Sequence, residues 1–145
     1  MRKISYIKAI GEAICEEMAR DEKVFLMGES VRGGVYQHTE GLIDQFGPDR
    51  VVDTPLAENA IVGAALGIAI AGYRPIADLM YADFFQVASD ELSKAGQWRM
   101  LQGGKHQIPI VYMAGNGGGL MIANDHSKML TANVLTNPGI KMVQA

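Results

Sequence analysis

The chain has 145 residues, of which 48% are hydrophobic and 20% are charged, a profile typical of one folded domain. Its net charge of −3 argues against nucleic acid as a partner, and its longest apolar stretch, residues 60–71, is too short to span a membrane. The single Cys15 cannot form a disulfide within the chain, and residues 2–21 lack the apolar segment of a signal peptide. We therefore expect a cytoplasmic protein.

Helical and strand patterns alternate along the chain. Apolar residues at three- and four-residue steps, together with their end signals, predict helices at residues 4–20, 39–46, 58–71, 84–101 and 127–135. Short apolar runs predict strands at residues 24–27, 51–52, 74–79, 108–113 and 140–143. This alternation indicates an α/β domain, a parallel sheet flanked by helices.

Four features are expected to follow the carboxyl ends of the strands, where ligands bind in such sheets. They are Glu29 after the first strand, Glu58 after the second, the segment at residues 81–85 after the third, and a glycine-rich loop that leads to His126. We expect these features to converge on one site.

Glu58 begins the helix at residues 58–71 and has two interpretations. An acid in the first turn of any helix interacts favourably with the helix dipole and requires no function. This helix, however, is almost wholly apolar and is expected to be buried on all sides. A buried carboxylate needs a hydrogen-bonding or charged partner. Gly63 and Gly67 of the same helix indicate a close backbone approach, either to the sheet of this domain or to another subunit.

Phe84 and Phe85 are adjacent, so they should face different surroundings. Phe85 has the spacing of a core residue, which leaves Phe84 to line a cleft. A lone histidine such as His126 is usually a surface or structural residue, and its position after the flexible loop raises the odds of a functional role only modestly. His38 and His106 have weaker contexts and are not assigned, and no cluster of cysteine and histidine suggests zinc.

Taken together, these stretches resemble a known family. The strings FLMGESV, TEGLIDQFGPDRVVDTPLAENAIVGAALGIAIAGYRPIADLMYADF, LQGG, DHS and NPGIKMV, in this order, resemble the beta subunit of the E1 component of 2-oxo acid dehydrogenase complexes. The resemblance extends over essentially the whole chain. It implies that residues 1–145 form the transketolase-like pyrimidine-binding domain, and that the C-terminal transketolase-type domain of such subunits lies outside this chain.

The resemblance also implies an activity, a cofactor and partners. Members of this family carry out the oxidative decarboxylation of a 2-oxo acid with thiamine diphosphate and transfer the acyl group to lipoamide on the E2 acyltransferase. Two alpha and two beta subunits form a heterotetramer, in which alpha holds the diphosphate and Mg²⁺ and beta holds the pyrimidine. We expect the chain to be inactive without an alpha subunit.

Roles for single residues follow from the same resemblance. Glu58 matches the glutamate that hydrogen-bonds N1′ of the aminopyrimidine, and Phe84 matches the aromatic residue that stacks on that ring. His126 matches an active-site histidine. Glu29 and Asp90 match acidic positions near the cofactor or between the paired sites. The expected catalytic residues are therefore Glu58 and His126, and the cofactor-binding residues are Glu58, Phe84 and Glu29.

Two alternatives remain open from the sequence. One is another transketolase-like thiamine diphosphate enzyme, although DTPLAENAIVGAALG fits the E1 beta subunit better. The other is a non-catalytic α/β binding or regulatory domain with the same fold. The segments YADFFQV and LMIAND border the expected substrate pocket and are not typical of one subfamily, so pyruvate, branched-chain and acetoin-type substrates all remain candidates.

Overall fold

The sheet consists of four parallel strands. A computed structural model describes residues 2–144, and its strands are hydrogen-bonded in the order β2-β1-β3-β4. The strands are β1 (Val24–Gly28), β2 (Val51–Asp53), β3 (Arg74–Tyr81) and β4 (Val111–Gly115). The α/β fold predicted from the sequence is thus confirmed.

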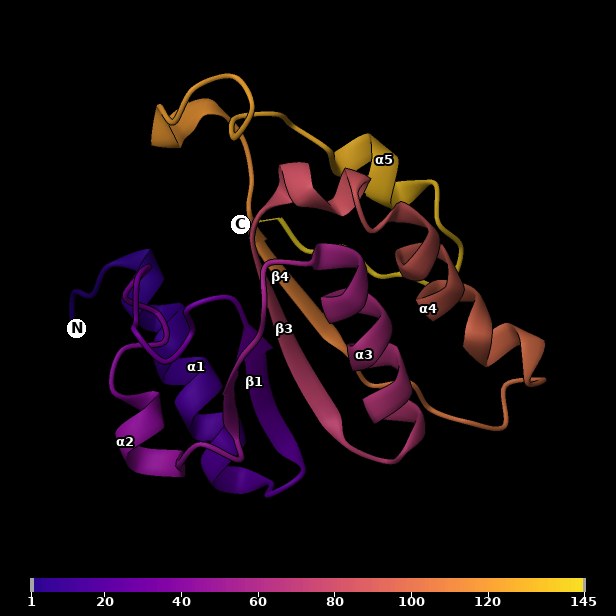
Figure 1. Cartoon of the computed structure of the whole chain (residues 1–145), viewed down its shortest axis with the longest axis horizontal. Helices are drawn as coiled ribbons and strands as arrows, with labels where there is room; N and C mark the ends of the chain where they lie inside the picture. The colour runs from indigo at the N-terminus through magenta and orange to yellow at the C-terminus, as the bar shows by residue number, and fades with distance from the viewer. Residues whose placement is uncertain (1, 145) are drawn as a thin grey trace.

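Helices cover both faces of the sheet, with α1 and α2 on one side and α3 and α4 on the other (Figure 1). The α-helices are α1 (Tyr6–Arg20), α2 (Leu42–Phe46), α3 (Glu58–Ile70), α4 (Ser89–Leu101) and α5 (Thr131–Leu135). Two short 3-10 helices are η1 (Ala82–Gln86) and η2 (Gly118–Leu120). Within residues 2–144, no helix is both long enough and apolar enough to cross a membrane.

Strand β1 contributes to a hydrophobic core on each face of the sheet. Leu26 is buried in a cluster with Ile14 and Met18 of α1, whereas Met27 is buried in a second cluster with Val62 of α3. Successive side chains of a strand point to opposite faces, so a strand covered on both sides needs a continuous apolar run. The run after residue 23 was predicted to be a buried strand for this reason, and that prediction is confirmed.

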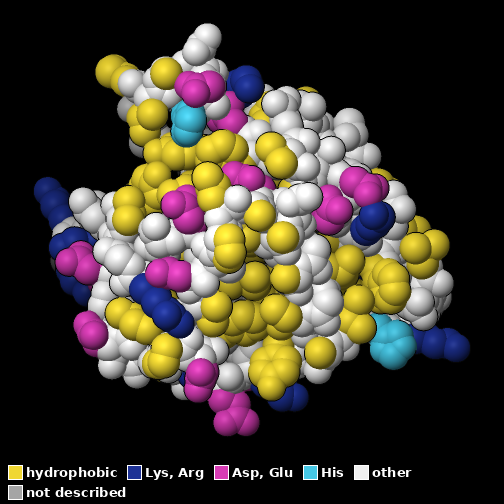
Figure 2. All heavy atoms as spheres, in the orientation of Figure 1, with side chains coloured by type: hydrophobic (Ala, Val, Ile, Leu, Met, Phe, Trp, Pro, Cys, Tyr) yellow, Lys and Arg dark blue, Asp and Glu magenta, His cyan; other side chains and the backbone are white. Residues whose placement is uncertain are grey.

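Helix α3 is not buried on all sides, and the prediction from its composition was wrong. Val62 faces the core, but Ala64 and Gly67 are exposed, and a Cβ added at Gly67 would meet no atom within 4 Å. A Cβ at Gly63 would lie 3.4 Å from the side chain of Glu91, an ordinary contact. The outer face carries small apolar residues instead of polar ones, and Figure 2 shows a hydrophobic area over α3. Composition alone therefore did not reveal the exposed face.

The helix predicted over residues 84–101 is two elements. The chain first forms η1 and then α4, and Met100 near the end of α4 is 68% exposed. The tighter 3-10 turn separates two adjacent rings: Phe85 packs against the core, whereas Phe84 lies beside His126. The core position predicted for Phe85 is confirmed, the cleft predicted for Phe84 stays a prediction, and the predicted helix is wrong.

The helix predicted over residues 127–135 is reduced to α5. The backbone N–H of Lys128 donates to the carboxylate of Asp83, and that of Leu130 donates to the side-chain oxygen of Asn116. These contacts hold residues 128–130 to distant segments, and the helix begins only at Thr131. Helix α2 is likewise shorter than its prediction.

Two strand predictions also need correction. Strand β4 begins at Val111 instead of residue 108, which is consistent with Pro109 having no N–H to donate to a ladder. Residues 140–143 form no strand with any described part of the chain, yet Ile140 packs against the core on the α3 side of the sheet. Burial accounts for the apolar pattern there without strand pairing.

Candidate functional site

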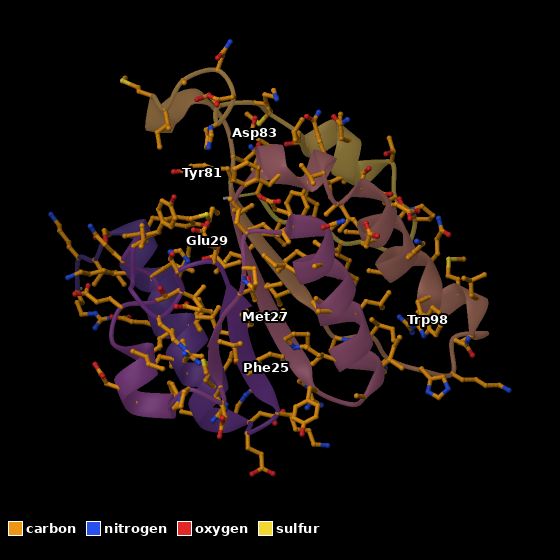
Figure 3. The ribbon with its side chains drawn as sticks, viewed as in Figure 1. Phe25, Met27, Glu29, Tyr81, Asp83 and Trp98 are labelled. Atoms are coloured by element: carbon orange, nitrogen blue, oxygen red, sulfur yellow. The ribbon has the colours of Figure 1, made fainter. Side chains whose placement is uncertain are left out.

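The carboxyl end of the sheet gathers side chains from separate segments. Glu29 follows β1, Tyr81 is the last residue of β3, and Asp83 lies in η1. Figure 3 shows these three residues toward the same end of the sheet, with Phe25 toward the other end. The carboxyl end is where parallel α/β sheets bind their ligands.

Aromatic rings from three segments meet at this edge. The ring of His126 lies 4.9 Å from that of Tyr81 and 5.3 Å from that of Phe84, both in edge-to-face geometry. The ring of Tyr36 lies 5.7 Å from that of Tyr81, and its hydroxyl donates a hydrogen bond of 3.0 Å to the Tyr81 hydroxyl. We call Tyr36, Tyr81, Phe84 and His126 the aromatic wall. The structure thus brings together Phe84 and His126, which the sequence had singled out separately.

The carboxylate of Asp83 anchors the segment that carries His126. Asp83 is 5% exposed, and its Oδ1 accepts a hydrogen bond from the backbone N–H of Lys128 at 3.3 Å. The ammonium group of Lys128 lies 3.7 Å from the same oxygen. His126 is only two residues away from Lys128, so this anchor holds His126 near the aromatic wall.

Three buried polar atoms have no hydrogen-bond partner within residues 2–144. They are Oγ1 of Thr54, Oδ2 of Asp83 and Nδ1 of His126. The Nδ1 atom lies 3.3 Å from the carboxylate of Asp125, but without the geometry of a hydrogen bond. Buried polar groups are usually paired, so these atoms are available to a ligand or to another chain.

Glu58 is the first residue of α3 and is half-buried. Its side chain makes no hydrogen bond or ion pair with any described residue. The structure therefore places Glu58 at the predicted helix start but leaves its carboxylate without a partner in this part of the chain. A half-buried acid in the first turn of a helix is favoured by the helix dipole.

The other two predicted acids differ in their surroundings. Glu29 is half-buried, accepts a hydrogen bond of 3.4 Å from the Ser30 hydroxyl, and is one of the charged groups that act on Tyr36. Asp90 is exposed and pairs with Lys94 one turn along α4. Glu29 thus borders the aromatic wall, whereas Asp90 makes an ordinary surface ion pair.

The sequence matches the pyrimidine binding domain of transketolase over residues 2–145. The chain belongs to the transketolase pyrimidine-binding domain family. It is 45% identical, over 99% of its length, to the 2-oxoisovalerate dehydrogenase subunit beta of Bacillus subtilis (strain 168), and it covers 45% of that protein.

Two further relatives carry other names. The chain is 42% identical over 97% of its length to the pyruvate dehydrogenase E1 component subunit beta of Rickettsia felis, and covers 44% of it. It is 43% identical over 98% of its length to the acetoin:2,6-dichlorophenolindophenol oxidoreductase subunit beta of Cupriavidus necator, and covers 46% of it. The chain therefore spans less than half the length of these relatives.

The residues of this pyrimidine-binding domain suit a flat, polar ring. Phe84 offers an aromatic surface, and Glu58 offers a carboxylate that has no partner within the described chain. The unpaired atoms of Asp83 and His126 add hydrogen-bonding capacity close to the phenylalanine. An aminopyrimidine needs this combination of a stacking surface and polar groups at its edge.

Sequence reasoning missed several residues that border the site. His38 was left unassigned, yet it is buried and lies 2.7 Å from the carboxylate of Asp78. Neither Tyr36 nor the side chain of Tyr81 was given a role of its own. One signal was visible, because Asp78 is an acid in the middle of the apolar strand β3. A charge at such a position normally has a partner.

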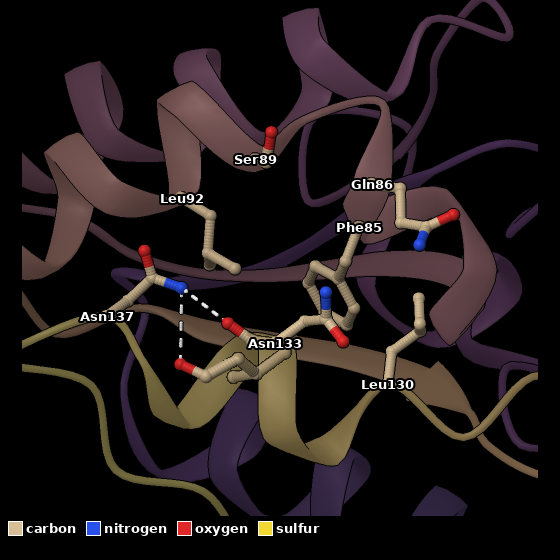
Figure 4. A pocket seen from close by; sticks show the side chains of 8 residues that line it. Phe85, Gln86, Ser89, Leu92, Leu130, Asn133 and Asn137 are labelled. Atoms are coloured by element: carbon tan, nitrogen blue, oxygen red, sulfur yellow. Dashed lines mark hydrogen bonds between the residues drawn. The ribbon is translucent and has the colours of Figure 1, made fainter.

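Two hollows in the structure lie apart from the aromatic wall. A cavity of about 30 Å³ between η1, α4 and α5 has room for water only, and Figure 4 shows Phe85, Leu92 and Leu130 along it. A more open groove of about 370 Å³ runs between α1 and residues 37–45. No cluster of metal-binding side chains occurs within the described residues.

Proposed function

We propose that the chain is the pyrimidine-binding part of the beta subunit of a thiamine-diphosphate-dependent 2-oxo acid dehydrogenase E1 component. This oxidoreductase decarboxylates a small 2-oxo acid and transfers the acyl group to lipoamide. The grouping of Phe84, Tyr81 and His126 at the carboxyl edge of the sheet carries the proposal. The printed names of the three relatives, each a dehydrogenase or oxidoreductase subunit beta, give it further support.

In this role Glu58 accepts a hydrogen bond from protonated N1′ of the aminopyrimidine. The carboxylate sits in the first turn of α3 and has no competing partner within residues 2–144, so it is free to make this contact. A charge-assisted hydrogen bond in a site shielded from water is stronger than one in bulk solvent. Thiamine diphosphate, when bound, supplies the carbon nucleophile and the electron sink that decarboxylation requires.

Phe84 and His126 act beside this carboxylate. Phe84 stacks on the pyrimidine ring and fixes its plane. The imidazole of His126 donates or accepts a proton at the oxygen of the substrate or at the incoming lipoyl group. Glu29 lies near the same wall and completes the cofactor-binding set.

The partners follow from the incomplete site. This chain supplies groups for the pyrimidine, whereas the diphosphate and its Mg²⁺ are held mainly by an alpha subunit in an α₂β₂ heterotetramer. The exposed, small-residue face of α3, with Ala64 and Gly67, suits close approach by another subunit. The E2 acyltransferase then receives the acyl group.

The test is the substitution Glu58→Gln in the chain reconstituted with an alpha subunit. Glutamine keeps the size of the side chain and removes its charge. We expect exchange of the C2 proton of thiamine diphosphate, followed by NMR in D₂O, to fall by at least about a hundredfold. The circular dichroism spectrum should be unchanged, because glutamine has nearly the same size and Glu58 makes no hydrogen bond or ion pair with the described chain.

Glu16→Gln, on the exposed face of α1, is the matched control and should exchange at the wild-type rate. Exchange at the wild-type rate in Glu58→Gln would show that the assigned role is wrong. Thiamine diphosphate should also raise the melting temperature only when the alpha subunit is present. Indifference to the cofactor, together with failure to bind alpha, would instead favour a non-catalytic domain.

A further inference from the structure

A histidine and an aspartate are buried together beneath the aromatic wall. His38 is 8% exposed and Asp78 is 4% exposed. Nε2 of His38 lies 2.7 Å from Oδ2 of Asp78, and its Nδ1 lies 3.2 Å from the carbonyl oxygen of Tyr36. A carbonyl and an ionised carboxylate can only accept hydrogen bonds, so both ring nitrogens must donate. The surroundings of His38 are therefore satisfied by the charged imidazolium.

The electrostatic balance agrees with this geometry. Burial lowers the pKa of His38, but the hydrogen bond and the charge of Asp78 outweigh it, so the pKa is raised above its ordinary value.

The chain is closely packed around the pair. A Cβ added at Gly11 of α1 would lie 2.8 Å from the carbonyl oxygen of His38, and one added at Gly28 of β1 would lie 2.6 Å from that of Asp78.

The same carboxylate shapes the end of β3. Oδ1 of Asp78 accepts a hydrogen bond of 2.9 Å from the backbone N–H of Met80. Met80 has a φ of 61°, and the pairing of β3 with β4 is irregular between Asp78 and Tyr81. A bulge of this kind redirects the side chains that follow it, which here include Tyr81. One carboxylate oxygen of Asp78 therefore binds His38, and the other binds the backbone of the bulge.

A second link joins the same two segments. The Tyr36 hydroxyl donates to the Tyr81 hydroxyl at 3.0 Å, and burial together with this bond raises the pKa of Tyr36 to about 12, so its proton is retained at neutral pH. The loop of Tyr36 and His38 is thus held to the end of β3 at two points. Tyr81 then lies edge-on to His126.

We propose that His38 and Asp78 are positioning residues, which hold Tyr81 and, through its ring, orient His126 in the site. Their importance for the reaction rests on the proposed function, but the positioning itself does not. Loss of the His38 charge weakens the hydrogen bond between His38 and Asp78, and the bulge that Asp78 stabilises becomes less rigid. The orientation of His126 is therefore coupled to the protonation of His38.

Other ionisable groups also surround this pair. Tyr36 supplies the carbonyl oxygen beside Nδ1 of His38, and the charges of Asp78 and Glu29 both act on the Tyr36 hydroxyl. The groove that His38 borders adds the side chains of Lys8, Glu12, Cys15 and Glu40. An experiment must therefore follow the two histidines individually.

NMR on the full chain, with ¹⁵N- and ¹³C-labelled histidine, makes this possible. In the wild-type protein the ring signals of His126 should be displaced by the ring currents of Tyr81 and Phe84, and His38 should lose its second ring proton at a higher pH than a free histidine does. His38→Gln should shift the His126 signals toward those of a free histidine. His106→Gln, at an exposed histidine in the loop after α4, should leave them in place.

A pH titration of the wild-type chain provides a second measurement that needs no variant. The His126 signals should show an additional transition at the pKa of His38. His126 signals that stay unchanged in His38→Gln and show no transition linked to His38 would overturn the proposal. If His38→Gln does not fold, Asp78→Asn and the titration decide the matter. None of these measurements needs thiamine diphosphate, so failure of the proposed function would leave them valid.

Discussion

The backbones of Gly96 and Gly139 are in direct contact: a Cβ added at Gly139 would lie 2.1 Å from the carbonyl oxygen of Gly96. A Cβ at Gly96 would lie 2.4 Å from the carbonyl oxygen of Pro138. The Ser93 hydroxyl also donates to the side-chain oxygen of Asn137. Helix α4 and the turn that follows α5 therefore pack with no space for a methyl group.

Gly96→Ala should therefore destabilise the chain, although alanine favours a helix. We expect the free energy of unfolding to fall by about 1–3 kcal/mol, because the added methyl group would displace the turn. Gly67→Ala is the control, since Gly67 of α3 faces open space. It should raise the stability of the isolated chain by up to about 1 kcal/mol. Urea unfolding measures the stability of both variants. Equal unfolding midpoints for Gly96→Ala and Gly67→Ala would show that the turn can move to make room for the methyl group at no cost.

Arg50 links the end of α1 to the start of β1. Its guanidinium donates to the carbonyl oxygens of Met18 at 2.6 Å, Asp21 at 2.9 Å and Val24 at 2.6 Å. Arg50→Lys keeps the charge but removes Nε, which also donates to the Val24 carbonyl oxygen at 3.1 Å, and with it the planar group that fixes these contacts. We expect a loss of about 1–3 kcal/mol in unfolding free energy.

Arg99→Lys, on the exposed surface of α4, is the matched control for Arg50→Lys. It should change the stability by less than about 0.5 kcal/mol. Thermal and urea unfolding of both variants would provide the comparison. Equal stability of the two variants would show that the contacts of Arg50 contribute nothing beyond its charge.

The raised pKa of His38 predicts how stability depends on pH. The folded state holds the His38 proton more tightly than the unfolded state does, so stability falls as pH rises. The contribution is complete below the ordinary histidine pKa of about 6.5 and is lost as pH rises through the folded value. Urea unfolding between pH 5 and about 9 measures this dependence. His38→Gln should remove it, whereas His106→Gln should retain it.

The Asp83 anchor predicts how the His126 segment moves. Asp83→Ala removes the acceptor of the Lys128 N–H, so hydrogen exchange of that amide should accelerate by about tenfold or more. Trypsin should also cleave faster after Lys128. Asp83→Asn retains an acceptor oxygen and should have a smaller effect. Asp90→Ala, at an exposed acid of α4, should leave the exchange rate and the cleavage rate at their wild-type values. Wild-type rates in Asp83→Ala would show that Asp83 does not anchor the His126 segment.

The edge of the sheet that carries the candidate site was predictable from the sequence, because the carboxyl ends of parallel strands share one edge. Glu29 was placed there by its position after an apolar run, and Phe84 was separated from Phe85 by spacing alone. These inferences need only local patterns and one rule of topology.

Other features depend on contacts that no local pattern encodes. The hydrogen bond between His38 and Asp78 joins residues 40 positions apart. The sequence around either residue does not indicate the other as its partner. The bulge that lets Asp78 reach Met80 is a tertiary adjustment. Similarly, small apolar residues gave α3 a uniform composition that concealed its exposed face.

The aromatic wall also has a consequence for how the chain folds. Tyr36 and Tyr81 are 45 residues apart, as are Asp83 and Lys128, so the site contains no local nucleus. Contacts of this range form slowly, because a long loop must close before they can stabilise anything. During synthesis the wall stays unmade until residue 128 has emerged. An NMR signal of His126 that is displaced by the Tyr81 ring would therefore report completion of the fold, and not one of its early stages.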